Sequence, residues 1–240
     1  MKKFSLNIAV LIAMVSVSIF TSCRYRCVHG SGNITTENRK ANEFNKLDIS
    51  GEFRVHLKQD SSLTLSITGD DNLLKYVSTS VEGNLLTIKS KKNFCTDDSI
   101  VVNIGIRSLK EIGASGAVSV SSNGKINTGD IKFDLSGATK INLDLNAANV
   151  ITEGSGMSEL NLTGQAASHR VESSGVSKIN AFDFVVGDYE INTSGVSHCR
   201  INVLKTLNIH SSGAADIEYK GSPSTVNNDK SGASTVKKVD

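Results

Sequence analysis

The chain has 240 residues, 38% of them hydrophobic, and a formal net charge of +2. It is long enough to bury a substantial core, and its nearly balanced charge argues against a basic surface for nucleic acid. A single proline and 20 glycines indicate repeated turns rather than disorder.

The first 22 residues predict a signal peptide. Two lysines follow Met1, an apolar run of about 13 residues extends from Ile8 to Phe20, and small residues precede Cys23. A cysteine in this position resembles a bacterial lipoprotein box, although such boxes usually carry leucine at the position of Phe20. The resemblance implies cleavage before Cys23 and lipid attachment to it. The alternatives are an ordinary signal peptide with a chance cysteine and a membrane-spanning helix, which needs about 20 apolar residues.

Residues 23–40 are polar and glycine-bearing, and we interpret them as a tether. Residues 41–111 predict an N-terminal β-region that caps the remainder. Apolar residues alternate with polar ones in 53–57, 63–67 and 100–106, as in strands with one buried face. Residues 81–85 predict a hairpin turn, and 72–77 a short helical turn.

Residues 89–98 form a polar loop with a short basic run. The run comprises Lys89, Lys91 and Lys92. We favour a solvated loop here over a site for an anionic ligand.

Residues 112–240 contain a repeat marked by Ser-Gly pairs. The spacings of the glycines are 21, 19, 19, 20, 18 and 19 residues, which is too short for helical repeats of about 33 residues. The residues four before and four after each glycine are mostly apolar. This pattern predicts a β-solenoid with rungs of about 19 residues, each depending on its neighbours for burial. Residues 41–240 would then form one continuous domain.

Each Ser-Gly pair is interpreted as a structural corner of the solenoid. Glycine tolerates positive φ at little cost, and serine can bond the turn backbone or stack along the ladder. A catalytic serine would need an adjacent base, and seven equivalent serines favour structure instead. The predicted turn glycines are Gly116, Gly137, Gly156, Gly175, Gly195, Gly213 and Gly232. A further pair, Ser50-Gly51, stands alone upstream.

The cysteines other than Cys23 predict no catalytic or metal site. Cys199 occupies an apolar position of the repeat, four residues after its glycine, and is expected to be buried. Cys27 and Cys95 lie outside the repeats, and an oxidising compartment leaves a disulfide between them open. We expect no cofactor.

The carboxylates of the repeat form no obvious cluster, with one exception. Glu153 and Glu172 both lie three residues before their glycines and are expected to stack. Such a pair could bind a cation or share a proton, but exposed surface charge is the simpler interpretation. Aromatic residues that could carry a sugar are few: Phe133, Phe182, Phe184, Tyr189 and Tyr219.

The chain resembles the Bacteroidetes envelope family called "putative auto-transporter adhesin, head GIN domain". The resemblance rests on four segments: 30–33, 44–51, the 81–85 hairpin and the Ser-Gly rungs. It implies a right-handed parallel β-helix and brings no catalytic residues. In Bacteroidetes lipoproteins, acidic residues soon after the lipidated cysteine favour export to the outer face, whereas Arg24 and Arg26 follow Cys23 here. The periplasmic face of the outer membrane and the cell surface both stay open.

Three functions fit these observations. We favour a non-catalytic envelope lipoprotein with an adhesin-like or scaffolding role, held to the membrane through its lipid. A carbohydrate-binding module is the first alternative, and a β-helical polysaccharide-active enzyme is the second. The glycan or protein partner and the oligomeric state are left open.

Overall fold

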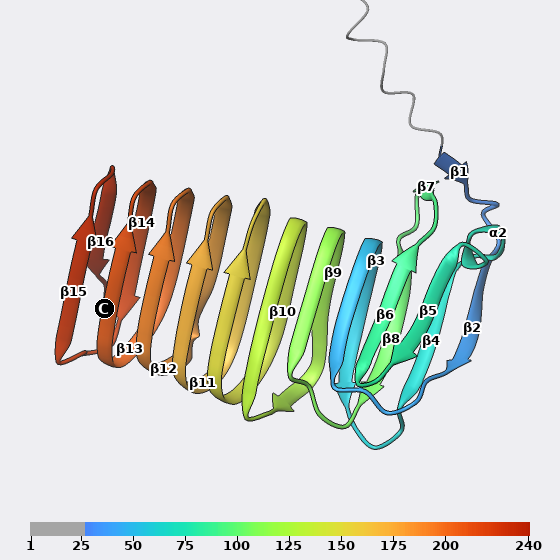
Figure 1. Cartoon of the computed structure of the whole chain (residues 1–240), viewed down its shortest axis with the longest axis horizontal. Coiled ribbons are helices and arrows are strands. Elements are labelled where there is room, and N and C mark those ends of the chain that lie inside the picture. The colour runs from blue at the N-terminus through green and yellow to red at the C-terminus, as the bar shows by residue number, and fades with distance from the viewer. Residues whose placement is uncertain (1–26) are drawn as a thin grey trace, which may run out of the picture.

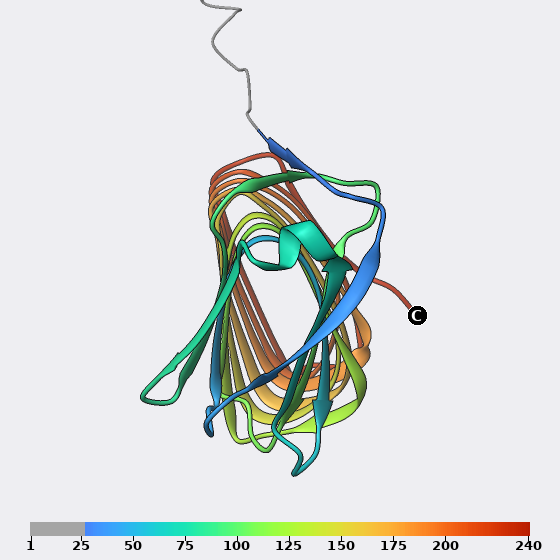
Figure 2. The ribbon, with the colours of Figure 1, turned by 90° about the vertical axis from the view of Figure 1, so that its right-hand side faces the viewer.

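The structure, a computed structural model, describes residues 27–240. It is a right-handed parallel β-solenoid, as predicted (Figures 1 and 2). Each coil rises along one face, turns at the Ser-Gly corner, descends along the opposite face and returns through a lower turn. The strands of the repeat are β9 (Glu111–Asn127), β10 (Asp130–Gly154), β11 (Met157–Ser173), β12 (Val176–Thr193), β13 (Val196–Ser211), β14 (Ala214–Lys220), β15 (Thr225–Lys230) and β16 (Ser234–Lys238).

Parallel pairing keeps the repeat in register, so equivalent residues form columns along the solenoid. Gly137 pairs with Gly116, and the strand register continues from β10 through β14. The register also reaches β3 (Lys46–Gln59), where Ser50 pairs with Ser115 and Gly51 with Gly116. The solenoid therefore begins at β3 rather than near residue 112, and the pair that stood alone in the sequence is its first corner.

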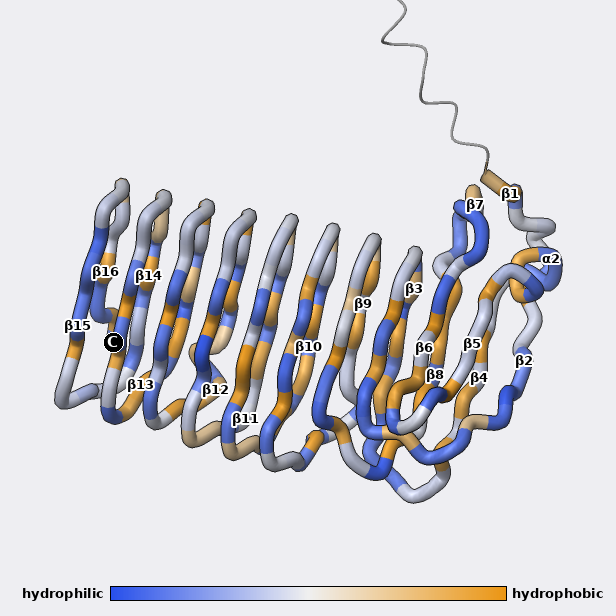
Figure 3. The backbone as a smooth tube through the Cα atoms, viewed as in Figure 1, coloured by the Kyte–Doolittle hydropathy of each residue, from blue (hydrophilic) through white to orange (hydrophobic). Residues whose placement is uncertain are grey.

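The core consists of the columns that the repeat pattern predicts. The residues four before and four after the corner glycines are mostly buried. Hydrophobic and hydrophilic residues alternate along the strands (Figure 3). The column before the corner contains Leu47, Ile112, Phe133, Thr152, Val171, Ile191 and Ile209, all buried. The column after it contains Val55, Val120, Ile141, Leu160, Ile179, Cys199 and Ile217, all buried.

The corner glycines are required for two different reasons. At Gly116, Gly137 and Gly156 φ is 92°, 79° and 83°, in the region that favours glycine. From Gly175 onward the corner glycines lie outside that region, so the positive φ predicted there is wrong. A Cβ on Gly175 would instead lie 2.1 Å from the carbonyl oxygen of Gly156, because successive corners stack directly on each other.

The residues between β3 and β9 lie at one end of the solenoid, and we refer to them as the cap. β4 (Thr64–Asp70) pairs antiparallel with β8 (Ile100–Ile106), which pairs parallel with β3. β5 (Val77–Glu82) and β6 (Leu85–Ser90) form a hairpin whose turn includes Gly83 with a φ of 58°. One helical turn, α2 (Asp71–Leu74), crosses the open end of the solenoid (Figure 2).

The prediction of a tether over residues 23–40 is wrong for its described part. β1 (Cys27–His29) pairs with β7 (Asn93–Cys95), and β2 (Ile34–Lys40) pairs antiparallel with β4. Cys27 and Cys95 form a disulfide. β2 is an edge strand with mostly exposed side chains, so it lacks the alternation that identifies a half-buried strand.

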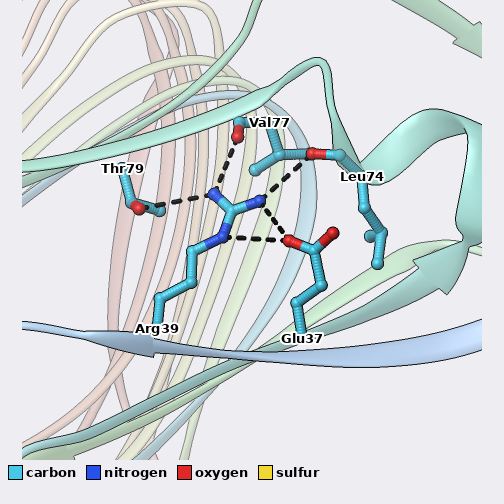
Figure 4. A network of polar contacts seen from close by, with 5 residues as sticks. All are labelled: Glu37, Arg39, Leu74, Val77 and Thr79. Atoms are coloured by element: carbon cyan, nitrogen blue, oxygen red, sulfur yellow. Dashed lines mark hydrogen bonds and ion pairs between the residues drawn. The ribbon is translucent and has the colours of Figure 1, made fainter.

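Arg39 binds β2 to the cap through one guanidinium group (Figure 4). Its Nη1 donates to the Val77 carbonyl at 2.7 Å and to Thr79 Oγ1 at 3.3 Å. Its Nη2 donates to the Leu74 carbonyl at 3.1 Å and contacts Glu37 Oε2 at 2.8 Å. These contacts account for order in a segment that has little apolar burial.

The opposite end of the solenoid is polar. All six residues of β15 are exposed, and only Ser234 of β16 is buried. A polar terminal rung disfavours further stacking of strands. No helix within residues 27–240 is long and apolar enough to cross a membrane.

Candidate functional site

A depression in the described surface runs beside the Ser-Gly corners, across successive rungs. We call it the corner furrow, and its volume is about 740 Å³. Two outward-facing columns line it: the residues three before each glycine and the serines of the corners. They are Asp134, Glu153, Glu172, Asn192, His210 and Asp229, with Ser155, Ser174, Ser194, Ser212 and Ser231.

Glu153 and Glu172 stack in the furrow as the sequence predicts, since they are direct partners in the parallel ladder. Each has a cationic neighbour. Lys132 Nζ lies 2.8 Å from Glu153, and Arg170 Nε donates to Glu172 at 2.8 Å. The hydrogen bond to Glu153 raises the pKa of Lys132, and that to Glu172 raises the pKa of Arg170. The two carboxylates are thus ion-paired, which removes the reason for them to share a proton.

No side-chain base forms a hydrogen bond to a furrow serine within residues 27–240. No side-chain hydrogen bond involves a corner serine between 115 and 231, so the predicted bonds to the turn or along the ladder do not form. His210 Nδ1 lies 3.6 Å from Asp229, but both side chains are largely exposed and no hydroxyl bonds to that imidazole. The geometry offers surface hydroxyls for recognition and lacks the serine–base contact of an activated nucleophile.

A second, smaller depression of about 520 Å³ lies on the opposite face, and we call it the amide pocket. Its centre is a ladder of three asparagines. Asn161 donates to Asn142 at 2.7 Å, and Asn180 donates to Asn161 at 2.6 Å. At one edge the ladder register shifts between Ala181 and Val185, so extra residues leave the regular coil.

Phe182 lies in that bulge and lines the amide pocket, half-buried. The Arg200 guanidinium lies 5.1 Å from the centre of its ring, and Lys220 Nζ lies 4.9 Å from it. Of the other aromatic candidates, Phe133, Phe184 and Tyr189 are buried in the core, and Tyr219 is partly buried. Phe182 is therefore the candidate that combines a depression with polar neighbours.

The cysteines behave as structural residues. Cys199 is buried in its apolar column, and burial raises the pKa of its thiol to about 12. The sulfurs of Cys27 and Cys95 lie close to His29, but the disulfide occupies them and leaves no thiolate for a metal. Cys23, the predicted lipid attachment site, lies outside the described residues.

A buried histidine was missed by the sequence reasoning. His169 lies in the core, where its Nε2 is 2.9 Å from Thr152 Oγ1 and its Nδ1 is 2.6 Å from the Tyr189 hydroxyl. Burial lowers its pKa to about 3 and raises that of Tyr189. The imidazole is therefore neutral and satisfied on both nitrogens. The polar residues around it in the sequence gave no sign of burial.

Comparison with solved structures supports the same fold. A protein from Bacteroides fragilis, described as a putative adhesin, has 24% identity and a TM-score of 0.79 over 88% of this chain and 100% of its own. A putative adhesin from Parabacteroides merdae has 23% identity and a TM-score of 0.61 over 89% and 99%. A putative lipid binding protein from Parabacteroides distasonis has 21% identity and a TM-score of 0.64 over 90% and 100%.

No curated protein sequence matches the chain. A family model does match it, over residues 43–223, which include the cap from before β3 onward and nearly all of the corners. The chain belongs to the family described as "Putative auto-transporter adhesin, head GIN domain".

Proposed function

We propose that this protein is a non-catalytic, lipid-anchored envelope protein of the adhesin type, whose corner furrow receives a macromolecular partner. The observation that carries the proposal is the furrow itself. It crosses rungs from Asp134 to Ser231 and presents hydroxyl, carboxylate and amide groups in repeated rows. A solenoid surface of this kind contacts an extended partner at many equivalent points. The family description supports the same reading.

The furrow chemistry supports binding more than turnover. Its central carboxylates are ion-paired with Lys132 and Arg170, and no base forms a hydrogen bond to its serines among the described residues. Catalysis on a polysaccharide needs two carboxyl groups held in defined acid and base roles. Repeated, ion-paired side chains provide many weak contacts instead.

The anchoring part of the proposal depends on Cys23. Acyl chains contribute about 0.8 kcal/mol for each buried methylene group, so acylation determines where the protein resides. We expect Cys23→Ala to move the protein from the membrane fraction to the soluble periplasmic fraction. Membrane pelleting of the variant at the wild-type level would reject lipid anchoring.

The Cys23→Ala protein also serves as a soluble reagent for finding the partner. We expect it to bind components of an array of glycans and extracellular proteins without altering them. Release of shorter products from a bound glycan would contradict the non-catalytic proposal.

A second candidate function, glycan binding at the amide pocket, is favoured by one specific observation. The Asn142–Asn161–Asn180 ladder lies beside the half-buried ring of Phe182, so amide hydrogen-bonding groups adjoin an apolar surface. Ligand pockets commonly combine an apolar wall with a few oriented polar groups. Loss of glycan binding in Phe182→Ala, with wild-type thermal stability, would assign binding to this pocket.

A further inference from the structure

The residue directly after each corner glycine is small or apolar and points outward, where most of the surface is polar. We call this column the corner ridge: Ala117, Ala138, Met157, Val176, Val196, Ala214 and Ala233, all exposed. Its large members occupy three consecutive rungs. Met157 is 62% exposed, Val176 48% and Val196 56%.

The ladder register makes the ridge continuous. Met157 pairs with Val176, and Val176 pairs with Val196, so their side chains follow each other at the strand spacing. At about 4.8 Å for each rung, the column from Ala117 to Ala233 is about 29 Å long. The ridge is a straight apolar edge on a rigid body, rather than scattered exposed residues.

One end of the ridge adjoins the point where the N-terminal chain enters the fold. Ala117 and Phe94 of β7 line the same small depression, and Cys95 of β7 is disulfide-bonded to Cys27. Both views place β1 and β7 at the edge of the solenoid that carries the Ser-Gly corners (Figures 1 and 2). The disulfide therefore fixes the start of the described chain beside the ridge.

The distance from this point to the predicted lipid is short. Four residue steps separate Cys27 from Cys23, and a fully extended chain covers at most about 3.5 Å for each, or about 14 Å in total. If Cys23 carries the acyl chains, as the proposed function requires, this edge of the solenoid is held close to the lipid surface.

We propose that the corner ridge docks on the lipid bilayer, so that the solenoid lies with its long axis along the membrane surface. Tethering makes docking an intramolecular event, and a modest apolar contact is then sufficient. The apolar side chains enter the boundary between headgroups and acyl chains, as those of interfacial segments do. The corner furrow, on the adjoining face, opens sideways along the membrane, and the lower turns lie farthest from it.

The charge near the anchored end does not select for anionic lipid. Lys91 and Lys92 are exposed there, but so are Asp97, Asp98 and Glu52. We therefore expect the docked state to form on zwitterionic phosphatidylcholine vesicles and to change little when anionic lipid is added.

A single-cysteine probe tests the orientation in the full acylated chain. The native cysteines do not interfere, because Cys23 is acylated, Cys27 and Cys95 are bridged, and Cys199 is buried. An environment-sensitive fluorophore is placed on Val176→Cys and, as the matched control, on Ala167→Cys at an exposed position of a lower turn. Phosphatidylcholine vesicles contain a fraction of lipid with a quencher in the acyl chain.

The proposal expects the Val176→Cys probe to lose fluorescence and the Ala167→Cys probe to keep it. A second variant, Met157→Glu with Val196→Glu, should restore the Val176→Cys signal while the protein still floats with the vesicles. Both of these side chains are exposed, so folding should persist, which a thermal melt checks.

Other outcomes overturn the inference in distinguishable ways. Flotation with neither probe quenched leaves the anchor intact and rejects ridge docking. Quenching of both probes equally rejects the fixed orientation. If the labelled Val176→Cys protein is not quenched and the unlabelled variant forms disulfide-linked dimers, the ridge binds a second copy of the chain instead of the bilayer. Failure to float rejects lipid anchoring, and thus the proposed function on which the inference rests.

Discussion

Replacement of Gly175 by alanine tests the stacking of the corners. The added Cβ would lie 2.1 Å from the Gly156 carbonyl oxygen and 2.7 Å from its nitrogen, whereas ordinary contacts begin near 3.4 Å. The two rungs must separate by more than about 1 Å at the corner. That movement breaks the 2.7 Å hydrogen bond from the Val176 N–H to the same carbonyl.

The expected cost follows from three contributions. Overpacking costs about 1–3 kcal/mol, and the lost hydrogen bond costs about 0.5–1.5 kcal/mol. Reduced freedom of the unfolded chain returns about 0.4–1 kcal/mol. We therefore expect Gly175→Ala to lower the free energy of unfolding by about 0.5–4 kcal/mol. For a domain of this size the melting temperature should fall by about 1–16 °C.

Gly129 provides the matched control. It also lies in a turn of the solenoid, but a Cβ there meets nothing within 4 Å and its φ is not in the left-handed region. Gly129→Ala should be neutral or stabilise by up to about 1 kcal/mol. The assay is thermal and urea unfolding of both variants followed by circular dichroism. Equal melting temperatures for Gly175→Ala, Gly129→Ala and the wild type would refute the stacking argument.

Three further predictions concern the core and the cap. Cys199→Val preserves the side-chain volume in an apolar column and should lower the free energy of unfolding by less than about 1.5 kcal/mol. The native thiol of Cys199 should resist labelling in the folded protein. Rapid labelling would place Cys199 outside the core. Burial lowers the pKa of His169 to about 3 in the folded protein, from about 6.5 in the unfolded chain. Between these pH values the unfolded chain binds a proton at His169 that the folded protein does not. The free energy of unfolding therefore falls as the pH drops, by up to about 1.4 kcal/mol per pH unit. His169→Phe should flatten that pH dependence in urea titrations, and an unchanged slope would exclude His169 as its source. The double variant Cys27→Ser with Cys95→Ser opens a loop with a sequence separation of 68. It should lower the free energy of unfolding by about 2–4 kcal/mol, which thermal melting would measure. Wild-type stability would show that β1 and β7 do not need the disulfide.

The repeat could be predicted from the sequence because the same short pattern of apolar residues and glycine recurs in every rung. Apolar residues four before and four after each glycine mark columns that only stacking can bury, and the structure buries them from Leu47 to Ile217. Cys199 could be placed in the core by this alignment alone. The hairpin at Gly83 was predictable for a similar reason, since its short turn requires residues that accept positive φ.

The limits of prediction lie where the period is interrupted or hidden. The excursion between β3 and β9 separates Gly51 from Gly116, so the first corner appeared isolated although it is in register. β2 was mistaken for tether because an edge strand held by backbone pairing and Arg39 needs no alternating burial. A longer rung containing Phe182 was visible as a spacing of 20, but only the structure shows that the extra residues bulge into a pocket.

The candidate site could be predicted from the sequence only in part, because it depends on the shape of the corner. The sequence predicted that Glu153 and Glu172 stack. The ion pair of Glu153 with Lys132 joins neighbouring rungs and could be seen only in the structure, whereas Arg170 and Glu172 lie two residues apart on β11. The residues directly after the glycines follow the alternation of the strands, in which the second and fourth residues after the glycine are buried, so Met157, Val176 and Val196 emerge at the surface.

The most direct test of the account compares two blocked surfaces in the same binding measurement. Ser174→Trp fills the corner furrow at its centre, and Thr163→Trp fills the amide pocket on the opposite face; both positions are exposed, so each variant controls for the other. Binding of the Cys23→Ala protein and these variants to the partner found on the array is measured by biolayer interferometry. If the partner binds in the corner furrow, Ser174→Trp abolishes binding and Thr163→Trp leaves it unchanged. Wild-type binding by the Ser174→Trp variant would contradict the assignment of the furrow as the partner site.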